Sequence, residues 1–197
     1  MYPEKGRMNM QGGSDVLLYH GSYCEVAVPD LSKCAQYKDF GQGFYLTTSR
    51  QQAESFSRTS RRRAVFRGDL PESQQYGVIS IFSCEADVCS RLQCCFFQTA
   101  DISWLHCITG HRKPAGFPGV VEQYQAYDIL GGKIANDATN ATITAYMAGV
   151  YGTVGSSRAA EFCISLLLPD RLQDQFCFRT QAALDSLHFV ESVRVWK

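Results

Sequence analysis

Two short stretches decide the fold of this chain: LLYHGS at residues 17–22 and FGQGFYLTT at residues 40–48. Each joins an apolar run, typical of a strand, to a glycine, where the absent Cβ lets another group approach the backbone. His20 stands directly before the glycine of the first stretch, and Tyr45 follows Gly43 by two positions in the second. The two stretches together predict a ligand site built on two strands, with His20 and Tyr45 beside it.

The size and charge of the chain place limits on its organisation. It has 197 residues, of which 45% are hydrophobic and 19% charged, which is enough to bury the core of one domain. We expect the polar residues 1–15 to form a flexible leader and residues 16–197 to form a single domain. The formal net charge is +0, from 19 basic and 19 acidic residues. No global preference for nucleic acid or for an anionic membrane follows from this balance.

The distribution of apolar residues bears on localisation. No apolar run approaches the roughly 20 residues of a membrane helix, and the residues after Met1 do not resemble a signal peptide. We therefore expect a cytoplasmic protein that makes no membrane contact.

The nine cysteines are an odd number, so they cannot all pair with one another. They are typical of reduced thiols that serve as small core residues. A zinc site suggests itself at first sight from Cys84, Cys89, Cys94, Cys95 and Cys107, with His106 and His111. However, Cys94 and Cys95 lie inside an apolar run rather than as a spaced pair on a turn. We expect no metal site.

Strand and helix patterns are mixed along the chain. We expect strands at residues 16–19, 44–47, 78–82, 127–132, 175–178 and 189–196. We expect helices at residues 50–58, 139–150 and 158–168, the end of another at 104–109, a loop at 110–119, and a short helix or turn at 180–187. Because strands and helices do not alternate regularly, the pattern favours an α+β fold.

Four ordered stretches also resemble a known family. The two opening stretches, with YDILGGKIAND at residues 127–137 and DQFCF at residues 174–178, resemble ADP-ribosyltransferases of the diphtheria-toxin and poly(ADP-ribose) polymerase type, the H-Y-E group. More narrowly, they are similar to a poorly characterised bacterial family of small intracellular ADP-ribosyltransferase-like proteins. The resemblance covers most of the chain. It implies NAD as co-substrate and an ADP-ribosyltransferase-type fold, a split antiparallel β-sandwich with surrounding helices.

The resemblance implies roles for the first stretch. His20, Gly21 and Ser22 match the histidine motif. In that motif the imidazole holds the adenosine ribose, and the glycine backbone pairs with the nicotinamide carboxamide.

The second stretch matches the tyrosine motif in the same way. Tyr45, which follows Gly43 and Phe44, matches the tyrosine that packs on nicotinamide. Phe56 comes eleven residues later, where polymerase-like members place a second aromatic ring on the other nicotinamide face. Ala53 stands where many members have a serine that bonds the carboxamide, so Gly21 would have to provide amide recognition alone.

The third motif departs from the family pattern. The family places a catalytic glutamate here, and Gln175 aligns with it, which gives a catalytic triad of His20, Tyr45 and Gln175. A neutral amide can bond a ribose hydroxyl but supplies no negative charge. Losing a charge-assisted contact costs about 1.5–3 kcal/mol, or roughly ten- to a hundredfold in rate. Asp174 cannot replace the glutamate, because neighbouring strand residues point to opposite faces.

A cluster of basic residues, Arg58, Arg61, Arg62 and Arg63, leaves two interpretations open. Its guanidinium groups could bind the dinucleotide pyrophosphate or a phosphate-bearing acceptor. The neutral net charge favours a solvated loop instead.

Three functions are compatible with these motifs. The first is a mono-ADP-ribosyltransferase that moves ADP-ribose from NAD to a macromolecular acceptor and releases nicotinamide. The second is an NAD glycohydrolase that acts as a toxin, with water as the acceptor. The third is a non-catalytic module that binds NAD or ADP-ribose, which the amide at Gln175 makes plausible.

Overall fold

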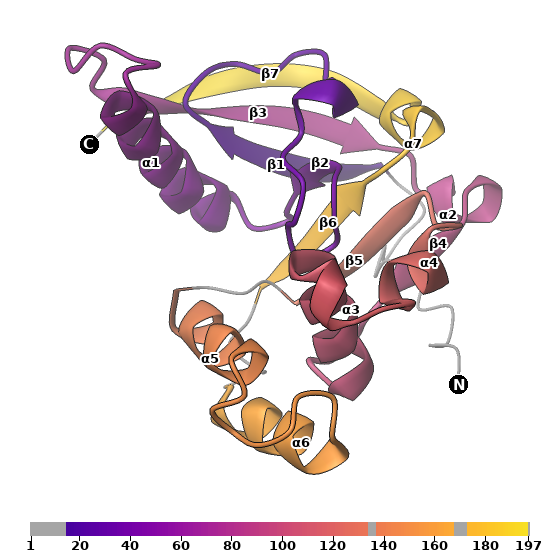
Figure 1. The fold of residues 1–197 in the computed structure, drawn as a ribbon. Coiled ribbons are helices and arrows are strands. Elements are labelled where there is room, and N and C mark those ends of the chain that lie inside the picture. Colours follow the sequence, from indigo (N-terminus) through magenta and orange to yellow (C-terminus); the bar gives the residue numbers. More distant parts are fainter. Residues whose placement is uncertain (1–14, 134–136, 168–172, 197) are drawn as a thin grey trace.

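The computed structural model describes residues 15–133, 137–167 and 173–196 (Figure 1). All of the expected leader except Asp15 lies outside these residues, as do Ile134, Ala135 and Asn136 of the third motif stretch.

Two β-sheets form the centre of the molecule (Figure 1). The first is antiparallel and has the order β1 (Val16–Ser22), β3 (Tyr76–Cys84), β7 (Leu187–Trp196). The second has the order β2 (Phe44–Leu46), β6 (Asp174–Phe178), β5 (Ile129–Lys133), β4 (Cys94–Phe96). With the helices below, these sheets confirm the predicted α+β class.

One pair of strands departs from the antiparallel sandwich that the resemblance implies. β4 and β5 are parallel, with Cys94 opposite Ile129. A parallel pair needs a long crossover connection. Here the connection contains α3 (Ile102–Arg112) and α4 (Val120–Tyr124), which the sequence pattern indicated only in part.

The remaining helices lie outside the two sheets. They are α1 (Arg50–Arg67), α2 (Val88–Arg91), α5 (Asp137–Met147), α6 (Ser157–Leu166) and α7 (Gln181–Asp185), with 3-10 turns at Leu31–Lys33 and Pro114–Gly116. Figure 1 shows α1 against the first sheet, and α3, α5 and α6 together on the far side of the second. Among the described residues, no helix is both long and apolar enough to cross a membrane.

Helix α1 corrects the interpretation of the arginine cluster as a loop. The helix begins after Ser49, whose side chain caps it, and ends at Gly68 with φ 80°, so it includes the whole cluster. Arginine is a good helix former, and only glycine adopts this left-handed cap without strain. Arg61 is buried because its guanidinium donates to the carbonyls of Glu72 and Gln74.

The core divides into three layers, which fix the direction of each strand residue. One layer lies between the two sheets, one lies between the second sheet and helices α3, α5 and α6, and a small one lies between α1 and the first sheet. On β6, Phe176 and Phe178 point into the layer between the sheets, whereas Cys177 points toward the helices. Gln175 shares the helix-facing side with Cys177, because strand side chains alternate.

The cysteines pack as expected. None of the nine forms a disulfide, and the buried ones are Cys84, Cys94, Cys95, Cys107, Cys163 and Cys177. Burial raises the pKa of the Cys95 thiol to about 11 and that of Cys177 to about 12, so both are protonated at neutral pH. Within the described part of the chain, no three His, Cys, Asp or Glu side chains are grouped to hold a metal ion.

Candidate functional site

The predicted site residues lie in two groups, one where β1 meets β2 and one around β6 and α3, although the Tyr45 side chain lies on the same face of the second sheet as Gln175. We call His20, Gly21 and Tyr45 the β1–β2 side. We call Asp39, Gln175 and the groups bonded to them the β6–α3 side.

On the β1–β2 side, the His20 imidazole is fixed by the strand beside it. Its Nδ1 lies 2.8 Å from the carbonyl oxygen of Tyr45, and its ring centroid lies 4.4 Å from that of Phe44. A carbonyl only accepts, so Nδ1 carries the proton. Burial lowers the pKa of His20, although the bond to Tyr45 opposes that shift. The imidazole is therefore neutral near pH 7, and its Nε2 is a hydrogen-bond acceptor.

The hydroxyl of Tyr45 is bonded within the protein. It donates a hydrogen bond to the carbonyl oxygen of Gly41 at 2.8 Å and accepts one from the backbone N–H of Phe40 at 2.9 Å. Burial raises the pKa of Tyr45 well above its usual value, so the phenol remains protonated. The ring of Tyr45, rather than its hydroxyl, is the part that a ligand could contact.

The bond between His20 and Tyr45 also separates two strands. Tyr19 and Thr47 exchange both backbone bonds, at 2.8 and 3.1 Å, on the side of β1 away from β3. In an antiparallel ladder the next such pair would be Gly21 with Tyr45. Instead, His20 Nδ1 donates a hydrogen bond to the Tyr45 carbonyl, and the backbone pairing of β1 with β2 does not continue beyond Tyr19 and Thr47. The N–H and C=O of Gly21 therefore point away from β3, on the β2 side of β1, and the residue itself is buried.

The glycines of both stretches are needed for packing. A Cβ on Gly21 would lie 2.2 Å from the carbonyl oxygen of Ala53 in α1. A Cβ on Gly43 would lie 2.5 Å from the Cys177 Sγ and 2.7 Å from the Phe178 carbonyl oxygen. The space beside these glycines, predicted for a ligand, is filled by the protein itself.

Two other predicted residues are less closely tied to this side. Ser22 ends β1 and is half-buried, and Phe56 lies on α1 with its side chain 52% exposed. No ring contact joins Phe56 to Tyr45 among the described residues. The predicted two-ring clamp on nicotinamide stays a prediction.

The β6–α3 side is a network of polar and charged side chains. Gln175, only 7% exposed, donates from Nε2 to Asp39 Oδ2 at 2.8 Å. Arg112, the last residue of α3, contacts the other oxygen, Oδ1, through Nε at 2.8 Å and Nη2 at 2.7 Å. Its Nη1 donates to Asn140 Oδ1 on α5 at 2.8 Å. The Asp39 carboxylate thus joins β6 to α3.

Sequence reasoning did not find Asp39, Arg112 or Asn140. Asp39 stands directly before the second glycine stretch, and that position was the only local signal. The partners of Asp39 lie 73 and 136 residues away along the chain, so only the fold brings them together.

The two sides meet through strand pairing. Tyr45 lies opposite Cys177 on β6, and Gln175 lies two residues along the same strand, on the same face. His20 reaches Tyr45 through the backbone, from the layer between the sheets. Across the described ranges, no hydrogen bond or ion pair joins His20 to Gln175 directly.

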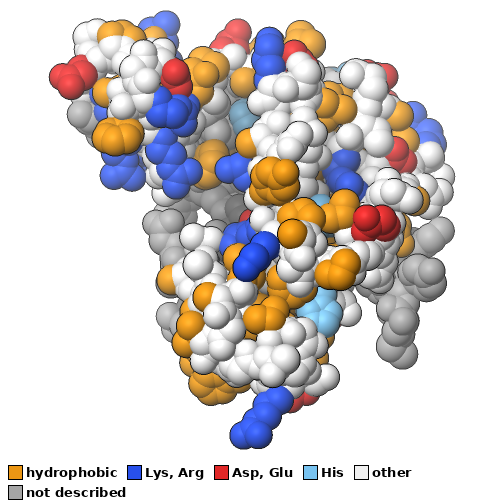
Figure 2. Space-filling model, in the orientation of Figure 1, with side chains coloured by type: hydrophobic (Ala, Val, Ile, Leu, Met, Phe, Trp, Pro, Cys, Tyr) orange, Lys and Arg blue, Asp and Glu red, His pale blue; other side chains and the backbone are white. Residues whose placement is uncertain are grey.

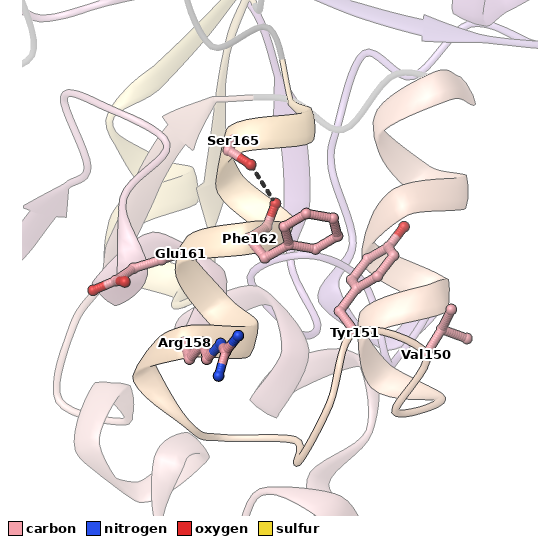
Figure 3. A pocket seen from close by; sticks show the side chains of 6 residues that line it. All are labelled: Val150, Tyr151, Arg158, Glu161, Phe162 and Ser165. Carbon is pink, nitrogen blue, oxygen red and sulfur yellow. Dashed lines mark hydrogen bonds between the residues drawn. The ribbon is translucent and has the colours of Figure 1, made fainter.

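Two hollows lie elsewhere on the surface. One, of about 570 Å³, lies beside α6, where the rings of Tyr151 and Phe162 meet edge to face with their centroids 5.3 Å apart (Figure 3). The other, of about 410 Å³, lies beside α1, where Figure 2 shows basic side chains gathered, and Arg58, Arg61 and Arg62 help to line it. The triad residues line neither hollow, so the assignment of the site rests on side-chain chemistry.

The chain belongs to the family described as protein of unknown function DUF3990, whose model matches residues 16–189. This match includes both glycine stretches and Gln175. No curated protein matches the chain.

Proposed function

We propose that this member of the DUF3990 family is an NAD-dependent mono-ADP-ribosyltransferase with an ADP-ribosyltransferase-type fold. It would move ADP-ribose from NAD to a macromolecular acceptor. The observation that supports this most is the bond between His20 Nδ1 and the Tyr45 carbonyl. It orients the imidazole at the edge of β1, where the Gly21 N–H and C=O point away from β3 and toward β2.

Each group on the β1–β2 side suits one part of NAD. Neutral His20 presents Nε2 as an acceptor, which suits a ribose hydroxyl. Among the described residues the bridge to β2 stops at Tyr19, so the N–H and C=O of Gly21 can act as a donor and acceptor pair, and a carboxamide has the complementary pair. Tyr45 offers a ring face for nicotinamide, and exposed Phe56 offers a second one from α1.

The proposed reaction replaces one bond at the ribose anomeric carbon. The bond to the nicotinamide nitrogen breaks, and its electron pair leaves with neutral nicotinamide. Positive charge develops on the ribose, and a lone pair of the acceptor forms the new bond while the acceptor loses a proton to solvent. Catalysis then depends on positioning and electrostatics. In this scheme the amide oxygen of Gln175 accepts a hydrogen bond from a ribose hydroxyl.

A second function, a non-catalytic NAD-binding module, is favoured by one observation. The Gln175 amide donates to Asp39, and residue 175 itself carries no charge to stabilise the ribose cation. A chain of this kind would bind NAD without releasing nicotinamide.

The test is nicotinamide release from NAD by the purified protein, with and without bacterial lysate. His20→Ala and Gln175→Ala are compared with wild type. His188→Ala and Gln181→Ala serve as matched controls, because both residues are exposed and lie outside the candidate site.

Transferase activity predicts lysate-dependent release, label on a macromolecule, and loss of both in the two site variants alone. Release without a labelled acceptor would favour the glycohydrolase instead. Binding of NAD with no release under any condition would favour the binding module. Neither binding nor release would contradict the proposal altogether.

A further inference from the structure

The Asp39 carboxylate lies where a charge is missing from the proposed triad. Its side chain is only 15% exposed, and its Oδ2 lies 2.8 Å from Gln175 Nε2. Asp39 comes from the loop just before β2, and the Phe40 and Gly41 backbone of that loop holds the Tyr45 hydroxyl. One loop therefore contacts two residues of the triad.

This contact settles the orientation of the Gln175 amide. A carboxylate accepts hydrogen bonds and cannot donate them, so the amide group facing Asp39 is the NH₂. The carbonyl Oε1 is then the acceptor of the side chain. A glutamate would also present an acceptor oxygen to a ribose hydroxyl. Gln175 therefore keeps the hydrogen-bonding role of the glutamate but not its negative charge.

We infer that Asp39 and Gln175 act together in place of a single catalytic glutamate, an inference that rests on the proposed function. Gln175 provides the acceptor oxygen, and Asp39 provides the negative charge through the hydrogen bond between them. As the nicotinamide bond breaks, the cation on the ribose is stabilised by this polarised amide. Asp39 is a positioning residue, since it acts through Gln175.

Arg112 sets the size of this effect. It holds Asp39 Oδ1 through two contacts and is itself 14% exposed, so the carboxylate is well fixed but partly neutralised. The pair therefore stabilises the ribose cation less than an unpaired glutamate would. We expect removal of the Asp39 charge to lower the rate about tenfold.

The same geometry explains why a glutamate does not suit position 175. In Gln175→Glu, a second carboxylate would lie within hydrogen-bond distance of Asp39 Oδ2. Two carboxylates this close cannot both be ionised, so they would share a proton. A carboxylate at position 175 would be accommodated if residue 39 were changed to asparagine. The asparagine NH₂ would then donate the hydrogen bond, and the glutamate would accept it.

The test exchanges the two groups. Asp39→Asn, Gln175→Glu and the double variant Asp39→Asn/Gln175→Glu are compared with wild type. Asp69→Asn serves as the matched control, because Asp69 also pairs with an arginine, Arg67 at 2.8 Å, but on the exposed end of α1. Nicotinamide release gives kcat and KM for NAD, and thermal unfolding shows whether each variant is folded.

We expect Asp39→Asn to lower kcat about tenfold with little change in KM, and Asp69→Asn to change neither. The double variant should recover at least wild-type kcat, a result that a purely structural role of Asp39 would not give. A kcat unchanged in folded Asp39→Asn, or no recovery in the folded double variant, would overturn the inference while leaving the transferase intact. If Asp39→Asn does not fold, the double variant alone decides. Absence of nicotinamide release from wild type would instead refute the proposed function, and this inference with it.

Discussion

The two sides of the candidate site are built from different interactions. On the β1–β2 side, His20 and Tyr45 are neutral and are held by backbone groups close in sequence or on the next strand. On the β6–α3 side, Gln175, Asp39 and Arg112 are held by one another's side chains across distant segments. The first side keeps the expected motif, and the second departs from it. The comparison indicates that orientation comes from backbone contacts and charge from side-chain contacts.

The largest expected effect concerns the ion pair of the β6–α3 side. Arg112→Met leaves Asp39 without its cation in a nearly buried setting, so we expect the free energy of unfolding to fall by about 3 kcal/mol. Arg67→Met breaks the exposed pair with Asp69 and should cost less than about 1 kcal/mol. Urea unfolding of both variants measures the difference. Equal losses of unfolding free energy would contradict the prediction that the nearly buried ion pair stabilises the fold more than the exposed one.

The next effect concerns the packing of the β1–β2 side. In Gly21→Ala the new Cβ would lie 2.2 Å from the Ala53 carbonyl oxygen, so β1 or α1 must shift, at about 1–3 kcal/mol. Gly116→Ala is the matched control, because its Cβ would meet only the flexible Lys113 side chain at 3.4 Å or more. Urea midpoints report the losses of stability. A Gly21→Ala variant as stable as Gly116→Ala would contradict the close packing of α1 on β1.

A smaller, pH-dependent effect is expected at His111, next to Arg112. Burial lowers the pKa of His111, so the folded state binds its proton less readily than the unfolded state. The contribution of neutral His111 to the free energy of unfolding is therefore fully present above the unfolded pKa, near 6.5. It falls as the pH drops below that value, by at most about 1.4 kcal/mol per pH unit. Unfolding at several pH values should show a shallower fall in His111→Gln than in wild type. Parallel curves for the two proteins would contradict the assignment.

The smallest effect on stability is expected at Phe56. Its ring is 52% exposed, so Phe56→Ala should change the free energy of unfolding by less than about 0.5 kcal/mol. If the ring stacks on nicotinamide, the same variant weakens NAD binding several-fold, since an aromatic pair contributes about 0.5–1.5 kcal/mol. Calorimetric titration with NAD measures this. Phe66→Ala, an exposed ring farther along α1, is the control. Equal NAD affinity in both variants would remove Phe56 from the site.

Much of the fold could be predicted because its signals are local. The strands that contain His20, Tyr45 and Gln175 were each predicted within a few residues, since apolar runs next to glycines or polar turns mark them. Helix α1 was predicted too short, because the arginines after Arg58 suggested solvent. The carbonyls that bury Arg61 belong to a later loop, which the sequence alone cannot place.

The candidate site also has a part that local sequence signals predict and a part that they do not. His20 and Tyr45 could be predicted from two short stretches, and the structure brings them into contact. The partner of Gln175 could not be predicted, because Asp39 lies 136 residues earlier in the chain. The reason for Gly21 was also different from the expected one, since α1 packing depends on the fold. Side-chain networks across long sequence separations remain beyond pattern analysis.

The most direct test of the central claim follows both halves of NAD in one reaction. NAD labelled in its adenylate phosphate is incubated with lysate and either wild type or His20→Ala, and free nicotinamide is measured in parallel. The account predicts that wild type transfers the phosphate label to a macromolecule in a one-to-one ratio with released nicotinamide, and that His20→Ala does neither. Failure of the wild-type protein to release nicotinamide or label any acceptor would contradict it.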